Sequence, residues 1–381
     1  MNSQIYLDHA ATTMVLPEVR DAMQPFLSEK YGNMSTTYEL GEEAKQAVEH
    51  ARELIAYCVD AEPEEIFFTS GGSESDNWAI KSIAGEFRSE GKHIITSQIE
   101  HHAVLHSCAY LEELGYEVNY LPVDENGMVD LKLLEEAITP HTTLITVMYG
   151  NNEIGTIEPV DAIGRLAREH KIPFHTDAVQ AVGQIPISVK REPIDLLSAS
   201  AHKFHGPKGV GFLYVKKDIP IPSFIHGGAQ EKGKRAGTEN VPGIVGMAEA
   251  LRISVLQMQK NRAHEGKLRN YFMERLVREI DGVRLNGHRY RRLPGNVNVS
   301  FSGVDASSLL TLLQEEGICA SAGSACNTGQ TRLSHVIEAI HVPEEYAYGT
   351  LRFTIGRENT RQQMDAVLLS LKRNLALLRN A

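Results

Sequence analysis

The feature that most restricts the fold of this chain is a regular alternation of short β-rich runs with helical patterns between about residues 60 and 215. Such alternation indicates an α/β layer, and we predict a large domain with a mostly parallel seven-stranded sheet. Ligand sites on such sheets lie beyond the carboxyl ends of the strands. The predicted strands are Ile66–Thr69, His93–Thr96, Glu117–Leu121, Thr143–Met148, Pro173–Thr176, Leu196–Ala199 and Val210–Val215. The predicted helices are Ser75–Phe87, Ala103–Glu113, Leu131–Ala137 and Ala162–His170.

A second, smaller unit is predicted towards the C-terminus, because 381 residues exceed what one hydrophobic core usually fills. We place the large domain at 1–257 and a smaller α+β domain at 258–381, with the first ~14 residues packing against the smaller one. The loop Pro220–Gly237 is expected to reach outward. The elements predicted around and within the second unit are a long helix from about Ile244 to Ile280, strands Asn296–Phe301, Ile318–Ala320 and Leu351–Thr354, and helices Ser307–Glu315 and Gln363–Leu378.

The charge balance narrows the class of function. Lys and Arg number 38 against 49 Asp and Glu, a net charge of −11, which argues against a general nucleic-acid or membrane-surface binder. The N-terminal residues lack a basic region followed by an apolar run, and no later run approaches the roughly 18 apolar residues of a membrane span. We therefore expect a cytoplasmic protein that acts on a small molecule.

Four cysteines are too few for a disulfide framework in so long a chain, and no two of them form a CxxC pair. Cys58 and Cys108 fall in helical patterns and Cys319 in a strand, so we interpret all three as structural. Cys326 differs, because it lies in the stretch Ser321–Gln330, which is rich in small and flexible residues. The question is what a single thiol does there.

A strand-to-helix turn with two glycines resembles a phosphate cradle. In Phe67–Ser75 the chain passes through Gly71 and Gly72 to Ser73. Free N–H groups at a helix start, together with a hydroxyl, suit a phosphate group. The pattern is neither GxGxxG nor a Walker loop, which disfavours a nucleotide. Taken alone, it is about equally compatible with a tight turn in which Ser73 caps the helix.

Two charged residues at strand ends are further candidates for the same site. Asp177 ends an apolar strand and is either a cap or an acid that faces a cationic ring nitrogen. Lys203 follows another apolar strand, where partial desolvation lowers the pKa of its amine and favours the neutral nucleophile. Lys208, within the next turn, is expected to be solvated. A phosphate cradle, a ring-nitrogen acid and a desolvated lysine together indicate a pyridoxal phosphate site.

These motifs, with others along the chain, resemble the class V aminotransferase group of fold-type I pyridoxal phosphate enzymes, and within it the NifS/IscS-like cysteine desulfurases. The likeness runs nearly end to end. The segments that carry it are Tyr6–Thr13, Thr69–Asn77, Glu100–His101, Asn151–Gly155, Asp177–Gln180, Ala201–Gly209, Ala236–Thr238, Gly323–Cys326 and Leu351–Arg357.

The resemblance implies a role for each matching residue. Lys203 is implied to bond covalently to the cofactor and to move protons, and Asp177 to keep the pyridine nitrogen protonated. Gln180 is implied to bond the phenolic oxygen, and His101 to stack on the ring and act in acid-base chemistry. The phosphate-side positions are Gly72, Ser73, Ser200 and His202. Asn152 and Arg352 match the groups that hold the substrate carboxylate, and a guanidinium fork suits that task. Thr238 matches a residue that reaches the phosphate of the neighbouring subunit, which implies a homodimer.

Cys326 falls at the position of the family's catalytic cysteine. The resemblance implies that its thiolate takes sulfur from L-cysteine as a persulfide, releases L-alanine and passes the sulfur to an acceptor such as an iron-sulfur scaffold or the tRNA-thiolation machinery. Gly323 and Gly329 are candidate hinges. Arg332 and Leu333 replace the family's usual Glu-Pro, which leaves the acceptor open. No metal site is expected, although Cys326 could share a cluster with a scaffold.

Two other functions stay open at this point. A related lyase acting on selenocysteine or on a cysteine derivative would not need Cys326. A catalytically inactive scaffold that binds a sulfur-transfer partner would have little use for Lys203.

Overall fold

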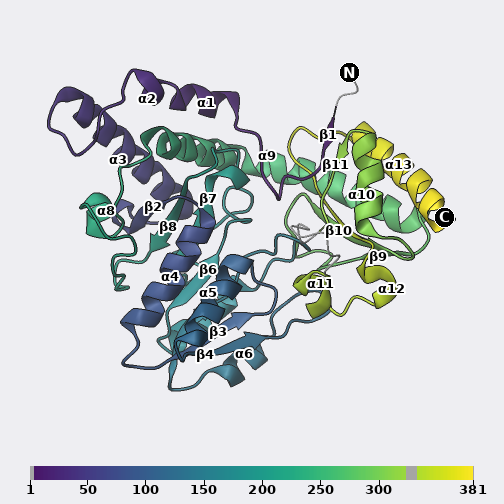
Figure 1. Ribbon diagram of the computed structural model, residues 1–381, viewed down its shortest axis with the longest axis horizontal. Coiled ribbons are helices and arrows are strands. Elements are labelled where there is room, and N and C mark those ends of the chain that lie inside the picture. Colours follow the sequence, from purple (N-terminus) through teal and green to yellow (C-terminus); the bar gives the residue numbers. More distant parts are fainter. Residues whose placement is uncertain (1–3, 323–332, 381) are drawn as a thin grey trace.

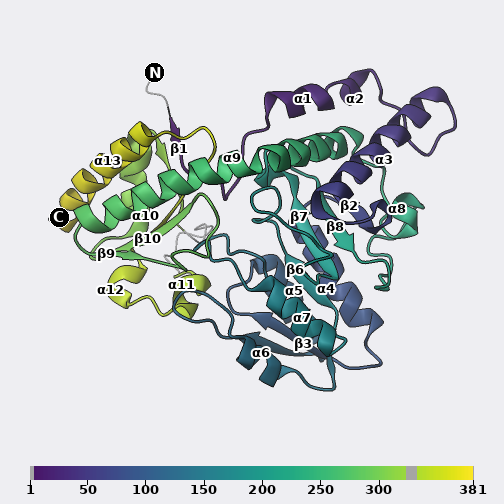
Figure 2. The same ribbon diagram turned by 180° about the vertical axis from the view of Figure 1, so that it is seen from behind.

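The computed structural model describes residues 4–322 and 333–380, and its centre is a seven-stranded sheet (Figures 1 and 2). The strand order is β2-β8-β7-β6-β5-β3-β4. Strand β8 runs antiparallel to both of its neighbours, and all the other pairs are parallel. The predicted α/β fold is therefore confirmed. The strands are β2 (Ile66–Thr69), β3 (His93–Ser97), β4 (Glu117–Leu121), β5 (Thr142–Thr146), β6 (Phe174–Asp177), β7 (Leu196–Ser200) and β8 (Gly211–Val215).

Helices cover both faces of this sheet, which is why its inner strands are buried along their whole length. Side chains alternate between the faces: in β8, Phe212 and Tyr214 join one apolar cluster, whereas Leu213 and Val215 join another. Edge strand β4 is only partly buried. The helices around the sheet are α3 (Glu39–Val59), α4 (Gly72–Glu86), α5 (His102–Glu113), α6 (Leu131–Ala137) and α7 (Val160–Glu169).

A separate core forms around a three-stranded antiparallel sheet of order β12-β10-β9. Leu7, near the N-terminus, belongs to this core, and β1 pairs in parallel with β11. The boundary at 257/258 itself stays a prediction. The elements of this part are β1 (Ile5–Tyr6), β9 (Val283–Leu285), β10 (Asn296–Phe301), β11 (Ile318–Cys319), β12 (Thr350–Thr354), α10 (Ala306–Glu315) and α13 (Arg361–Arg379).

The 39-residue helix α9 (Val241–Glu279) connects the two cores (Figure 2). Its first half packs in the core of the large sheet, and its second half packs in the smaller core. By length and composition alone α9 could cross a membrane, contrary to our expectation, but 56% of its most apolar stretch is buried within the protein. The short helices are α1 (Pro17–Met23), α2 (Pro25–Ser28), α8 (Gln230–Gly233), α11 (His335–Ala339) and α12 (Glu344–Ala347).

The segment Pro220–Gly237 only partly reaches outward. Residues 225–229 are exposed, but Glu231 is buried and accepts two hydrogen bonds from Arg52, at 2.9 Å each, and one from the Phe68 backbone. The prediction of an outward loop is therefore wrong for the end of this segment. The reason is an ion pair between residues 179 positions apart, which no local pattern reveals.

Replacing Glu231 by alanine should lower the free energy of unfolding by about 3–5 kcal/mol, because it leaves the Arg52 guanidinium buried without its partner. Equilibrium urea unfolding of the cofactor-free protein measures this change. Glu136→Ala, which breaks an exposed pair with Lys132, is the control and should cost no more than ~1 kcal/mol. Equal effects of the two substitutions would contradict the assignment.

Candidate active site

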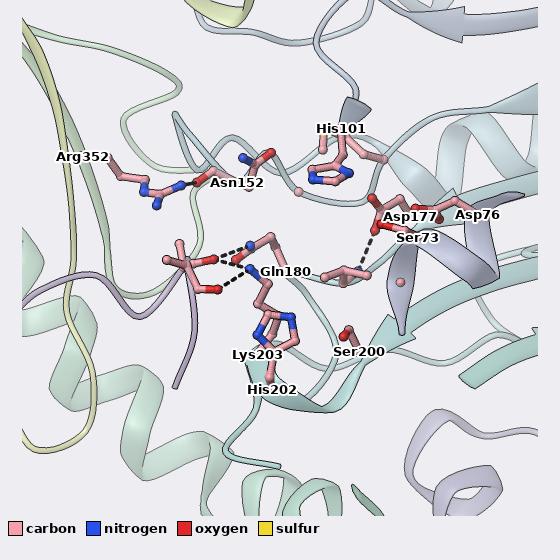
Figure 3. Close-up of a pocket in the computed structure, with 16 residues that line it drawn as sticks. Ser73, Asp76, His101, Asn152, Asp177, Gln180, Ser200, His202, Lys203 and Arg352 are labelled. Atoms are coloured by element: carbon pink, nitrogen blue, oxygen red, sulfur yellow. Dashed lines mark hydrogen bonds between the residues drawn. The ribbon is translucent and has the colours of Figure 1, made fainter. Parts of the chain in front are cut away.

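A cavity of about 320 Å³ lies beyond the carboxyl ends of β2, β3, β5, β6 and β7, where a mostly parallel sheet is expected to bind its ligand (Figure 3). Figure 3 shows the labelled side chains around one opening. The cavity brings together nearly all the predicted site residues: Gly72, Ser73, His101, Asn152, Asp177, Gln180, Ser200, His202, Lys203 and Arg352.

One described site residue, Thr238, is not in this cavity. Thr238 is exposed and lines a separate cavity with Ser70, Gly209 and Arg235, so it does not reach the cavity of its own chain. Cys326 and the candidate hinges Gly323 and Gly329 lie outside the described residues. The roles assigned to these residues stay predictions.

Lys203 closes a short 3₁₀ turn, Ala201–Lys203, that follows β7 directly. Its Nζ donates hydrogen bonds to the backbone carbonyls of Ala10 and Ala11. Burial, together with the Arg352 charge, lowers the pKa of the amine to about 8. A substantial fraction of the amine is therefore neutral near physiological pH, as covalent bonding to a carbonyl group requires.

Asp177, at the end of β6, is buried, and its Oδ1 accepts a hydrogen bond from the Val179 backbone at 2.9 Å. Burial raises the pKa of its carboxyl group, opposed by the electrostatic influence of His101 and Lys203 and by the Val179 hydrogen bond. No described residue forms an ion pair with Asp177. A cationic ring nitrogen would provide the missing partner.

The first turn of α4 forms the wall expected to hold phosphate. A Cβ atom on Gly72 would come within 2.6 Å of Val179 Cγ2, so only glycine fits at this approach. Helix α4 begins at Gly72, earlier than the predicted Ser75, and places Ser73 in its first turn, where free N–H groups suit an anion. Opposite, burial and the Lys203 charge lower the pKa of His202 to about 4, so its ring is a neutral hydrogen-bonding group.

His101 serves two purposes at the start of α5. Its Nδ1 accepts a hydrogen bond from the Ala103 backbone at 3.1 Å, so it caps the helix, and the neutral ring carries its proton at Nε2. The same side chain lines the cavity, with a ring nitrogen within 4.8 Å of carboxylate oxygens of Asp177 and Asp76. Capping and lining the cavity are therefore compatible.

Arg352, on β12, brings the smaller sheet to the cavity. Its Nη2 pairs with Asp8 at 2.8 Å, and its Nη1 donates to the Asn152 carbonyl at 2.9 Å. Its buried Nε has no hydrogen-bond partner among the described residues. The Arg352 side chain lines the cavity, where its guanidinium is placed to meet a ligand carboxylate.

Pyridoxal phosphate fits this donor set. Asp177 would hold the ring nitrogen, the first turn of α4 with His202 would hold the phosphate, and Lys203 would bond the aldehyde carbon. Gln180 Nε2 donates to the Ala10 carbonyl at 3.0 Å, and its expected contact with the phenolic oxygen stays a prediction.

Comparison with known proteins agrees with this geometry. The pattern of the aminotransferase class-V family matches residues 5–367. The chain belongs to this family. Enzymes of the aminotransferase class-V family with this fold use pyridoxal phosphate, as predicted.

Curated relatives and solved structures place the chain within the class-V family. It is 50% identical over 379 residues to a cysteine desulfurase IscS of Dictyoglomus turgidum, covering 100% of this chain and 96% of that one. It is 51% identical to a cysteine desulfurase IscS of Methanosarcina thermophila, covering 100% and 94%. A solved NifS-like protein matches with a TM-score of 0.93 at 39% identity, covering 98% and 100%. The structure described as SspA in complex with cysteine has a TM-score of 0.83 at 38% identity, covering 93% and 100%.

Sequence reasoning missed three residues of this class-V site. Ala10 and Ala11 accept hydrogen bonds from the Lys203 amine through their backbone carbonyls. Because every residue has such a carbonyl, the identity of the side chain gives no signal for this contact. Asp76 also lines the cavity, is fully buried and leaves its Oδ1 without a hydrogen bond. Burial, and then the Asp177 charge, raises its pKa well above the usual value. The only signal for Asp76 in the sequence was its place in Thr69–Asn77.

The described thiols differ in setting. Burial raises the pKa of Cys58 to about 11 and that of Cys108 to about 12, so neither is a ready thiolate near neutral pH. Cys319 accepts a hydrogen bond from Gln4 at 2.9 Å. None of these three lines the cavity.

Glu100 lies directly before His101, and its titration gives a testable pH dependence. Its Oε1 accepts hydrogen bonds from Ser97 and from the Met148 backbone, and burial raises its pKa from 4.5 to about 8. The folded state therefore binds this proton more tightly than the unfolded state, and stability is lost as pH rises from about 4.5 to about 8.

Glu100→Gln should remove that loss, because the amide oxygen can accept the same two hydrogen bonds without a charge. We expect the variant's free energy of unfolding at pH 8 to exceed that of wild type by on the order of a few kcal/mol, with a smaller difference at pH 5. Urea unfolding at both pH values is the measurement. A difference in stability between the variant and wild type that is the same at pH 8 as at pH 5 would refute this assignment.

Proposed function

We propose that the protein is a pyridoxal phosphate-dependent cysteine desulfurase, which converts L-cysteine to L-alanine and takes the sulfur on Cys326 as a persulfide. The observation that carries the proposal is the meeting of Lys203 and Asp177 in one cavity, in a chain about half identical to proteins named cysteine desulfurase. A similar structure described with cysteine bound supports the substrate class.

The residues that line the cavity divide the proton chemistry between them. When bound, pyridoxal phosphate withdraws electrons from the amino acid attached to it. Asp177 holds the proton of the ring nitrogen, and the Ala10 and Ala11 carbonyls orient the Lys203 amine. With a pKa of about 8, that amine can take a proton from the substrate carbon and return it. His101 holds a further proton at Nε2 beside the same space.

Arg352 and Asn152 hold the substrate carboxylate in this proposal. The Arg352 guanidinium, which lines the cavity, is the donor, and Asp8 fixes its plane through Nη2. A charge-assisted hydrogen bond in a buried site is worth more than one in water, so this contact also selects amino acids.

The residues on either side of Cys326 support its assignment. Ser321, five positions earlier, pairs through its backbone with Arg352. On the other side, Ser334 donates to Glu153 at 2.6 Å, next to Asn152, and His335 donates to the Glu100 carbonyl. Both anchors therefore lie beside residues of the cavity.

The sulfur transfer is balanced without an added oxidant or reductant. The Cys326 thiolate forms a bond to the substrate sulfur, and the carbon–sulfur bond breaks with its electron pair staying on the carbon side. A proton then completes the methyl group of alanine. The enzyme retains one sulfur atom as a persulfide.

Mass spectrometry of the Cys326 peptide after incubation with L-cysteine, without reductant, should show one added sulfur. Cys326→Ala should lose desulfurase turnover, whereas Cys58→Ala, which removes a half-buried thiol, should retain it. Undiminished alanine formation by Cys326→Ala would refute the persulfide route and favour a lyase.

Lys203→Ala should bind pyridoxal phosphate only reversibly. Borohydride treatment followed by intact-mass measurement should attach the cofactor to wild type but not to this variant. Lys208→Ala, which removes an exposed lysine from the following turn, is the control and should be labelled like wild type. Labelling of the Lys203→Ala variant would show that another lysine carries the cofactor.

The proposal extends to assembly and cellular context. A cytoplasmic homodimer is proposed, with Thr238 of each subunit reaching the phosphate in the other and an iron-sulfur scaffold or a similar protein accepting the sulfur. The exposure of Thr238 outside its own cavity supports the dimer.

A further inference from the structure

Histidines gather at the rim of the cavity, where α5 meets α11. His102 and His106 are one turn apart on α5, and their ring centroids are 5.1 Å apart. His335, the first residue of α11, places its ring centroid 4.8 Å from that of His102. The desulfurase chemistry above uses none of these three side chains.

The tautomer of His335 is fixed by its surroundings. Its Nε2 lies 3.0 Å from the Glu100 carbonyl oxygen, which can only accept, so Nε2 carries the proton. The neutral ring therefore has its lone pair at Nδ1. A ring N–H bonded to a backbone carbonyl is the usual support for a histidine that binds a metal through its other nitrogen.

The ring spacings suit one small cation. Zinc binds imidazole nitrogen at about 2.0–2.1 Å in tetrahedral sites, which places the centroids of two ligand rings roughly 5 Å apart. The His102–His106 and His102–His335 separations both approach this value. Histidines four residues apart on a helix form one face, as in helical zinc motifs. His106 is exposed, so its ring can turn towards a shared ion.

We propose that His102, His106 and His335 form a binding site for a divalent transition-metal ion of the zinc class, with water completing the coordination. Imidazole ligands favour Zn²⁺, Co²⁺, Ni²⁺ and Cu²⁺ over Mg²⁺ or Ca²⁺. The ion joins α5, on the large sheet, to the start of α11. This site adds a metal where the sequence predicted none, and it does not depend on the proposed desulfurase activity.

A second group of possible ligands must be separated from this site. Asp76, His101 and Asp177 already have ligand atoms within 4.8 Å of one another, whereas the three histidines need the His106 ring to turn, but the Asp76 group lines the cofactor cavity. The experiment therefore uses the holoenzyme, in which pyridoxal phosphate occupies that cavity. The Cys326→Ala background removes the thiol that would otherwise compete for zinc.

Zinc chloride is titrated into this holoenzyme against a chromophoric chelator, and cobalt chloride provides a visible spectrum of the coordinated ion. We expect one tight site per chain, and we expect His106→Gln, His102→Gln and His335→Gln each to weaken it at least about tenfold. His50→Gln, which removes an exposed histidine from α3, is the matched control and should bind as the parent does. Zinc should also raise the melting temperature of the parent but not of His106→Gln.

Among the described residues, the exposed His106 ring contacts only the ring of His102, so His106→Gln tests the site without endangering folding. Unchanged zinc affinity in His106→Gln and His335→Gln overturns the proposal. So does tight zinc binding that appears only after removal of the cofactor and disappears in Asp76→Asn, because the ion would then occupy the cofactor cavity.

Discussion

The common direction of six strands is the constraint on which the site depends. Strand β8 is reversed, but every strand of the large sheet that leads to a site residue ends at the same edge. Asp177 and Lys203 belong to neighbouring strand ends, and the glycine turn before α4 follows β2. Residues more than a hundred positions apart in the chain thus meet at one edge because their strands begin together on the opposite edge.

Burial of charge gives this edge its chemistry. Burial and the Arg352 charge lower the pKa of the Lys203 amine to about 8, and the hydrogen bonds of that amine go to two backbone carbonyls. Around it, Asp177, Asp76 and Glu100 are buried acids with raised pKa values and no ion pair to a cationic side chain of the described residues. His175, 3.7 Å from Asp76, is held neutral, because burial lowers its pKa to about 3. The buried acids of the site therefore lack a cationic partner, and a protonated ring nitrogen would provide one.

Local signals in the sequence were enough to predict the strands and the residues that follow them. Ser73, Asp177 and Lys203 each stand after an apolar run that ends abruptly, so their placement follows from the strand pattern alone. Asp76 could not be predicted in this way, because it lies within a polar stretch whose composition is typical of an exposed segment. Only the packing of α4 against the sheet buries it. The Arg52–Glu231 pair and the meeting of His102 with His335 join distant segments, and a single sequence has no periodicity that records such contacts. The sequence pattern predicts a loop through both glycines and a helix from Ser75, whereas Gly71 adopts a φ of 149° and lets α4 begin at the next residue, Gly72.

The continuous helix α9 limits how this enzyme can open. A regular helix of 39 residues is roughly 58 Å long, and each half is embedded in a different core. Swinging one core away from the other would require bending a hydrogen-bonded rod along its length. Arg352 and Asp8 approach the cavity from the smaller sheet, so they are carried at a nearly constant spacing from Lys203. Small molecules must therefore enter and leave through movements of short connections and side chains at the rim of the cavity, while the two cores move as one rigid unit.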